Sequence, residues 1–171
     1  MNKLVIFIVF ISFIFSCSGS DKSSNITVLK HHYITQIQKL KKDNIKLTKY
    51  ISKGKKRDTL YIDKVNWKKE LSLFLESDIS KNKIDFYKIT SFEDSSKFLF
   101  QTTSNKQTVK KLKYSLVNND LIVNIDVHKR SGLYDFLYYL ELSSKGYLIE
   151  VKQKVRMVYE SKYIIEGKFR K

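Results

Sequence analysis

The second half of the chain alternates apolar and polar residues with a period of two, the pattern of a β-strand with one buried face. Short runs rich in Ser, Asn, Asp, Gly and Lys interrupt this pattern and predict turns. Because such connections are short, consecutive strands should be antiparallel neighbours in a meander. The expected strands are 86–92, 97–103, 109–117, 121–129, 133–142, 147–159 and 162–170.

The polar positions of the expected strand 147–159 are mostly basic. Since alternate residues share one face of a sheet, these side chains should form a basic row on the outer face. We expect two basic residues of the last strand to join this row. The candidate residues for contact with an anionic surface are therefore Lys152, Lys154, Arg156, Lys168 and Arg170.

The expected strand 133–142 differs from the others because it is apolar on both sides. Tyr134 and Phe136 lie on one side of the alternation, and Leu137 and Tyr139 lie on the other. We therefore expect this strand to be covered on both faces.

Helical periodicity precedes the strands. From Ile26 to Asn44 or Lys46, apolar residues recur at steps of three and four, with Asn25 as a plausible N-cap. A hairpin is expected over 47–62, because residues favouring strands flank Lys53-Gly54-Lys55.

A second helix should follow, capped by Asp63 or Asn66. Its apolar stripe contains Trp67, Leu71 and Phe74. We interpret Trp67 as a core residue rather than a ligand-stacking one, because large aromatic side chains dominate cores through their buried area. Its expected partners are Tyr134, Phe136 and Tyr138 on the strands.

These elements predict an α+β fold, with a curved antiparallel sheet of about six or seven meandering strands and two N-terminal helices packed on one face. The sequence contains no proline and 5 glycines, so Pro-rich linkers between domains are absent. A chain of this length suits a single domain, which we place at 26–171.

The N-terminus has the pattern of a secretion signal. Lys3 is followed by an apolar run that polar residues end after residue 15, too short for a membrane span. The segment Ile14-Phe15-Ser16-Cys17 resembles a lipobox, the motif of lipoprotein signal peptidase. We therefore predict cleavage of residues 1–16 between Ser16 and Cys17, lipid attachment to Cys17, and a flexible tether over 17–25. An exported chain whose single cysteine is acylated also leaves no unpaired thiol.

The segment 63–71, Asp-Lys-Val-Asn-Trp-Lys-Lys-Glu-Leu, is followed by Phe74 and by 78–81, Asp-Ile-Ser-Lys. This arrangement resembles a group of small, functionally uncharacterised lipoproteins of Bacteroidota, flavobacterial-like in type. In them a lipobox and a Trp-x-x-Glu-Leu-x-x-Phe helix ending in Asp-Ile-Asn-Lys-Pro precede a run of strands. This chain has Ser80 for the Asn and Asn82 for the Pro. The resemblance implies a lipid-anchored envelope domain and no particular activity.

Charge and the signal together limit the partners. Removing residues 1–16 takes away Lys3 and lowers the net charge from +16 to +15. Such a charge suits nucleic acid, but an exported, anchored protein rarely meets it, so an anionic lipid or an acidic envelope protein is the expected partner. The alternative explanation of this charge is a lysine-rich composition that reflects no particular partner. Surface-exported relatives carry several acidic residues after the cysteine, whereas here only Asp21 follows, which favours the periplasmic face of the outer membrane.

Candidate catalytic and metal-binding residues are few, and we predict neither an enzyme nor a cofactor or metal site. His31 and His32 are adjacent on a helix and point about 100° apart, so they cannot share a metal as an i, i+4 pair does. His128 stands alone on a strand. Glu70 and Asp78 are interpreted as a solvated helix edge and a cap.

Two functions stay open. The first is a non-catalytic interaction or assembly subunit that docks its basic sheet face. The second is a periplasmic carrier that holds a hydrophobic ligand between the sheet and the helices. A bent antiparallel sheet with helices across its concave side resembles the half-barrels of periplasmic lipoprotein carriers. An apolar cavity of about 300 Å³ or more would favour the carrier, and a filled core would favour the interaction subunit.

Overall fold

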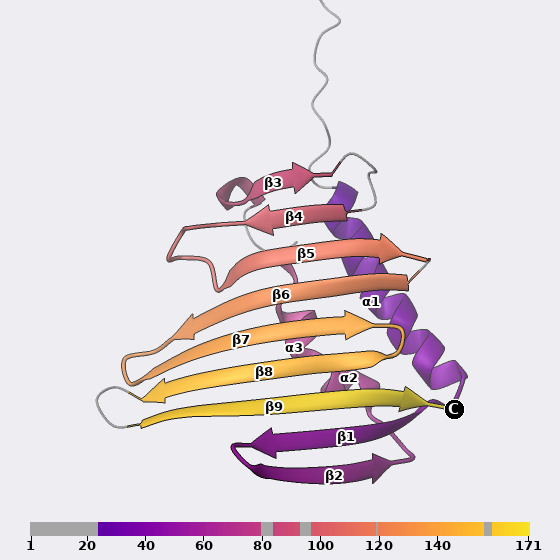
Figure 1. The fold of residues 1–171 in the computed structure, drawn as a ribbon. Coiled ribbons are helices and arrows are strands. Elements are labelled where there is room, and N and C mark those ends of the chain that lie inside the picture. The colour runs from indigo at the N-terminus through magenta and orange to yellow at the C-terminus, as the bar shows by residue number, and fades with distance from the viewer. Residues whose placement is uncertain (1–23, 80–83, 93–96, 119, 156–158) are drawn as a thin grey trace, which may run out of the picture.

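The computed structural model describes residues 24–79, 84–92, 97–118, 120–155 and 159–171. Its main element is a nine-stranded sheet, ordered β2-β1-β9-β8-β7-β6-β5-β4-β3, in which every neighbouring pair is antiparallel (Figure 1). The strands are β1 Lys46–Lys53, β2 Lys56–Ile62, β3 Lys88–Ser91, β4 Lys97–Gln101, β5 Val109–Val117, β6 Asp120–Arg130, β7 Tyr134–Ser143, β8 Gly146–Val155 and β9 Tyr159–Arg170. The helices are α1 Ser24–Lys42, α2 Trp67–Glu70 and α3 Ser72–Glu76, with a 3-10 turn at Ile84–Phe86.

The predicted meander is confirmed from β3 to β9, and the α+β class fits. The predicted number of strands is wrong, because the hairpin β1–β2 joins the same sheet and makes nine strands rather than six or seven. Strand β1 pairs with β9, with Leu47 opposite Phe169 and Ile51 opposite Ile165. The first hairpin therefore extends the sheet beyond the C-terminal strand.

The helices also differ from expectation. Helix α1 includes Ser24 and Asn25, so Asn25 is not its N-cap, and the helix begins two residues before the expected domain boundary at 26. The helix ends at Lys42, and Asn44 follows with a left-handed φ of 48°. The expected second helix is divided at Leu71 into α2 and α3. Both follow the first hairpin as predicted, but that hairpin belongs to the sheet, so they lie between strands of the sheet along the chain.

The start of α2 agrees with one of the two predicted caps. The Asn66 side chain accepts a hydrogen bond from the backbone N–H of Lys69, 3.1 Å away, which satisfies a group that the first turn leaves unpaired.

The three helices lie on one face of the sheet, which we call the covered face (Figure 1). Trp67 is 2% exposed and packs edge-on against Phe169 of β9, with ring centroids 5.2 Å apart. Phe74 of α3 meets Tyr147 of β8 in the same way at 6.3 Å. The prediction of Trp67 as a core residue is confirmed, but its predicted partners are wrong, because Tyr134, Phe136 and Tyr138 stack on one another along β7 instead.

The opposite side of the sheet, which we call the open face, has no described helix over it (Figure 1). Leu137 is 47% exposed and Tyr139 is 36% exposed there. The prediction that β7 is covered on both faces is therefore wrong for the described residues. Among the described residues, every buried member of the hydrophobic core lies between Tyr33 and Ile149.

Some predictions concern residues outside the described part of the chain. These are the signal segment 1–16, Ser16, Cys17 and the tether as far as residue 23, together with Arg156. Among the helices that are described, none is long and apolar enough to cross a bilayer.

Candidate interaction surface

Basic and aromatic side chains gather on the open face where β2, β1 and β9 adjoin. The register explains the grouping: Tyr61 and Lys168 both lie opposite Thr48, on the two sides of β1, and alternation places Tyr50 on the same face. We call this set the basic–aromatic strip. It consists of Tyr50, Arg57, Tyr61, Lys168 and Arg170.

Each cation of the strip lies close to a ring. The Arg57 guanidinium carbon is 4.5 Å from the centre of the Tyr50 ring, and the Lys168 ammonium is 5.5 Å from it. The Arg170 guanidinium carbon is 5.4 Å from the centre of the Tyr61 ring. Contacts of this kind are worth about 0.5–1 kcal/mol at exposed sites. Their main effect here is to hold three cations in place at the surface.

One carboxylate lies within the strip. Glu166 is 3.6 Å from the Arg57 guanidinium and 3.4 Å from the Lys168 ammonium. A single carboxylate shared by two cations leaves an excess of positive charge, and exposed pairs of this kind add about 0–1 kcal/mol to stability. The strip can therefore present cations to an anionic partner.

The structure separates the predicted basic row into two ends of the open face. Lys152 and Lys154 are exposed on β8, but Lys152 lies opposite Lys162, six residues along β9 from Lys168. At about 3.3 Å per residue this is roughly 20 Å. Lys168 and Arg170 belong instead to the strip. Tyr50, Arg57 and Tyr61 were not predicted as candidate residues, because no nearby residue in the sequence indicates that the first hairpin pairs with β9.

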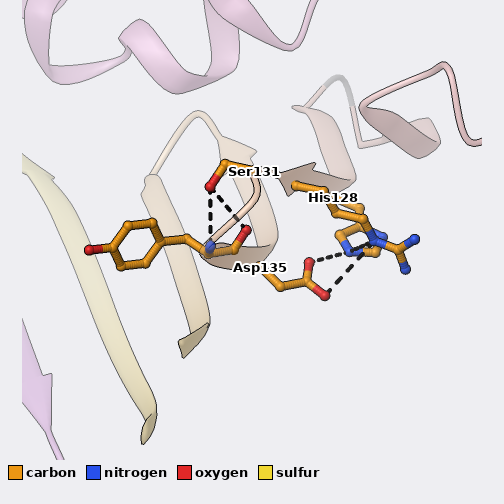
Figure 2. Close-up of polar contacts among 5 residues, drawn as sticks. His128, Ser131 and Asp135 are labelled. Atoms are coloured by element: carbon orange, nitrogen blue, oxygen red, sulfur yellow. Dashed lines mark hydrogen bonds and ion pairs between the residues drawn. The ribbon is translucent and has the colours of Figure 1, made fainter. Parts of the chain in front are cut away.

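The end of the open face near Lys154 contains a polar cluster that the sequence analysis also missed. Asp135 Oδ1 contacts His128 Nε2, and Asp135 Oδ2 lies 3.9 Å from Arg130 Nε, as Figure 2 shows. Arg130 Nε also lies 3.0 Å from His128 Nε2. Pairing residues outward from a turn centred on Gly132-Leu133 would have found the cluster, because it places Arg130 opposite Asp135.

Ser131 does not extend this cluster into a nucleophilic triad. Its hydroxyl accepts a hydrogen bond from the backbone N–H of Tyr134 at 3.1 Å, on the side of the turn away from His128 (Figure 2). A triad needs the hydroxyl on one ring nitrogen and the carboxylate on the other. Here Asp135 and Arg130 both approach the same nitrogen of His128. The geometry fixes the hairpin and groups charges on the open face.

A hollow of about 310 Å³ adjoins this cluster on the open face. Its lining includes Asp126, His128, Tyr139, Glu150 and Lys152. Burial raises the pKa of Asp126, and the nearby charge of Lys111 acts in the opposite direction. Glu150 pairs with Lys162 at 2.9 Å. Charges of both signs share this hollow, so it selects for no single class of ion.

On the covered face, the predicted solvated position of Glu70 is wrong. Its carboxylate accepts a hydrogen bond from the Lys49 ammonium at 2.7 Å and another from the Tyr147 hydroxyl. The side chain is 16% exposed, because α2 lies directly over β1 and β8. Asp78, which was predicted to be a cap, is 7% exposed. Burial, with the bond to Glu70, raises the pKa of Tyr147. This arrangement satisfies charge inside the fold, so we assign it a structural role.

A groove of about 610 Å³ separates α1 from the ends of the strands. One side of α1 contributes His32, Gln36 and Lys39 at helical spacing, and Asp43 follows directly after the helix. The Gln36 amide donates a hydrogen bond to the Ser143 carbonyl at 2.9 Å, which holds the helix against the turn between β7 and β8. The groove lies at the edge of the covered face, whereas the space beneath α2 and α3 is filled.

The two histidines of α1 differ in their exposure to solvent. His31 is exposed, whereas His32 is partly buried beside the groove. Burial lowers the pKa of His32, the charge of Asp120 opposes this shift, and His31 adds to it. Within the described residues, no group of three or more His, Cys, Asp or Glu side chains is placed to hold a metal ion.

Comparisons with known proteins give no further assignment. No protein-family model, curated protein or solved structure matches this chain. The features that bear on function are therefore the strip, the cluster around His128 and the groove beside α1.

Proposed function

We propose that this chain is a lipid-anchored, non-catalytic interaction protein of the bacterial envelope, and that it docks an acidic partner on the open face of its sheet. The observation that carries the proposal is the basic–aromatic strip, which positions three cations on a face without a described covering element. The anchor itself is proposed from the lipobox-like Ile14-Phe15-Ser16-Cys17. The proposed location is the periplasmic face of the outer membrane.

The position of α1 favours a protein partner over the anchoring membrane. In Figure 1 the start of α1 lies beside β4 and its end lies near β9 and the C-terminus. Its 19 residues span about 28 Å at 1.5 Å per residue. The strip lies at the far edge of the sheet from Ser24. A chain tethered through Ser24 would therefore present the strip away from the point of attachment.

The filled core supports the interaction role over the carrier. Trp67, Phe74, Phe100, Leu112 and Ile125 are each at most 2% exposed. The Trp67 and Phe74 side chains fill the space between α2, α3 and strands β8 and β9, which is part of the interior where the expected carrier would hold its ligand. The groove of about 610 Å³ beside α1 lies at the edge of this filled space and not within it.

The anchor is tested in the full chain. Cys17→Ala should abolish incorporation of labelled palmitate and release the protein from membranes, because the acyl chains supply the binding energy. Retention of Cys17→Ala in the membrane fraction after a high-salt wash would contradict the anchor.

The docking surface is tested with residues 18–171, using polyglutamate as a model acidic polypeptide. Binding should weaken as salt shortens the Debye length from about 10 Å at 0.1 M. The triple variant Arg57→Gln, Lys168→Gln, Arg170→Gln should lose most of it. The matched control Lys41→Gln, Lys42→Gln, Lys69→Gln removes the same charge from exposed helix positions and should retain binding.

Three outcomes would contradict the docking proposal. Equal losses in the two triple variants would mean that net charge alone drives binding. Stronger strip-dependent binding to phosphatidylglycerol vesicles than to polyglutamate would identify a lipid partner. No salt-sensitive binding at all would remove the basis for an acidic partner.

A further inference from the structure

The groove beside α1 has an apolar floor inside the fold. Leu40, Ile45, Leu121 and Phe169 line it. Leu40 is 6% exposed, and the other three are partly buried and pack against the hydrophobic core. The ring of Phe169 packs edge-on against the buried Trp67, which does not itself line the groove. An apolar segment of a ligand could therefore lie against a rigid surface.

The rim of the groove is charged and predominantly basic. Lys39, Lys145, Arg170 and Lys171 line it, together with the acidic side chains Asp43 and Asp120. Asp120 is partly engaged, because one carboxylate oxygen accepts a hydrogen bond from the Ser144 backbone N–H at 3.0 Å. His32 adds little positive charge near neutral pH, since burial lowers its pKa. The rim thus offers an excess of cations above an apolar floor.

We propose that this groove binds a single-chain amphiphile with an anionic headgroup, its acyl chain lying on Leu121 and Phe169 and its head at the Lys145 side of the rim. The volume of about 610 Å³ is within the 300–1,000 Å³ typical of small-molecule sites. A purely polar anion leaves the floor exposed, and a neutral hydrocarbon leaves the cations without a partner. The combination of floor and rim selects the amphiphile.

This inference goes beyond the docking proposal and does not depend on it. The groove lies between α1 and the strand ends, and of the strip residues only Arg170 also lines it. A result at the groove therefore leaves the docking test unaffected when the variants avoid Arg170.

The chain has a built-in reporter for this site. Trp67 is its single tryptophan, and its ring lies 5.2 Å from Phe169, which lines the groove. An acyl chain against Phe169 should change the environment of Trp67. We therefore expect a saturable change in tryptophan emission when residues 18–171 are titrated with dodecanoate below its micellar concentration.

Three probes distinguish the chemistry of the ligand. Dodecanoate and dodecyl phosphate both carry an anionic head, and the tighter binder identifies a carboxylate or a phosphate source. Dodecyl maltoside has the same chain with a neutral head and should bind at least about fivefold more weakly.

Two pairs of variants locate the site. Thr35→Phe places a ring in the groove from an exposed position of α1 and should abolish the saturable signal, whereas Ile34→Phe, on the neighbouring exposed position, should not. Lys145→Gln should weaken dodecanoate binding about threefold to tenfold, by loss of one charge-assisted contact. Lys154→Gln is its matched control on the open face and should leave the affinity unchanged.

Each alternative result overturns the proposal in a defined way. Absence of saturable binding of either anionic probe, with an intact thermal midpoint, excludes the site. Equal binding of dodecyl maltoside excludes recognition of the anionic head. Unchanged binding in Thr35→Phe places the ligand elsewhere.

Discussion

The two faces of the sheet differ along every central strand, and β6 shows the difference residue by residue. Val123, Ile125 and Val127 point to the covered face and are at most 4% exposed. The residues between them, Asn124 and Asp126, point to the open face and are partly exposed. Alternate side chains of the same strands thus form the packed core on one face and a surface of charged and aromatic residues on the other.

This difference divides stability from recognition. Burying a large apolar side chain contributes about 1.5–3 kcal/mol, so substitutions on the covered face should act on folding. Substitutions on an exposed surface usually change stability by less than about 0.5 kcal/mol. Effects on the open face should therefore be seen in binding and not in the free energy of unfolding.

The largest expected effect is at the centre of the covered face. Trp67→Ala should lower the free energy of unfolding by about 3–5 kcal/mol, because it leaves a cavity against Phe169. Lys68→Ala, at the next and exposed position, should be nearly neutral. Denaturant titration of both variants measures the difference. An unchanged midpoint in Trp67→Ala would show that Trp67 is exposed in solution and would end the distinction between the faces.

The next effect tests close packing on the same face. A Cβ at Gly167 would lie 2.1 Å from the Tyr147 ring, whose hydroxyl is held by Glu70. Gly167→Ala should therefore cost about 1–3 kcal/mol through overpacking. Gly132→Ala is the control, since a Cβ there meets nothing within 4 Å. Equal thermal midpoints for the two variants would mean that the ring of Tyr147 lies elsewhere.

A smaller effect depends on pH. Burial and the bond to Glu70 raise the pKa of Tyr147 above its ordinary value of 10.0. The folded state then keeps the phenolic proton to higher pH than the unfolded state. This contribution to stability is complete below pH 10 and is lost as the pH rises above it. Tyr147→Phe should cost about 1 kcal/mol at neutral pH through the lost hydrogen bond, yet lose less stability than the wild type on alkalinisation.

Urea titrations at pH 7 and above pH 10 test this expectation. Tyr61→Phe serves as the control on the open face, where Tyr61 is 73% exposed, and should leave stability and its pH dependence unchanged. Parallel alkaline loss in the wild type and Tyr147→Phe would contradict the role assigned to the phenol.

The parts of this fold that follow from neighbouring residues were predictable from the sequence. Strand β5 has the predicted bounds, 109–117, and β6 extends the predicted 121–129 by one residue at each end. The alternation that predicts these strands is local, and the short turns between them fix the order of neighbours. The burial of Trp67 was predicted for the same reason, from its place in an apolar stripe.

What the sequence did not predict depends on contacts between distant segments. Nothing near Leu47 indicates that β1 will pair with β9, so the strip residues Tyr50, Arg57 and Tyr61 were not recognised as candidates. Glu70 is mostly covered because it pairs with Lys49 of β1 and Tyr147 of β8, which are distant from it in the sequence. The anchor at Cys17 stays a prediction, since it lies outside the described residues.

The smallest expected effect on stability is on the open face, where the effect on binding should be large. Lys168→Gln removes a cation that lies 5.5 Å from the Tyr50 ring and 3.4 Å from Glu166. Exposed contacts of this kind contribute about 0–1 kcal/mol, so the free energy of unfolding should fall by no more than about 1 kcal/mol. Affinity for polyglutamate should fall, and its dependence on salt should become shallower, because fewer cations are engaged.

Lys162→Gln provides the matched control for this prediction. It removes the same charge from the same strand and face, but Lys162 lies opposite Lys152, away from the strip, and already pairs with Glu150. Urea titration measures the free energy of unfolding, and a salt series measures polyglutamate binding. Lys168→Gln should mainly weaken binding, whereas Lys162→Gln should change neither binding nor stability strongly. A large loss of stability in Lys168→Gln would mean that the strip is part of what holds β1 to β9. The open face would then share the structural role of the covered face.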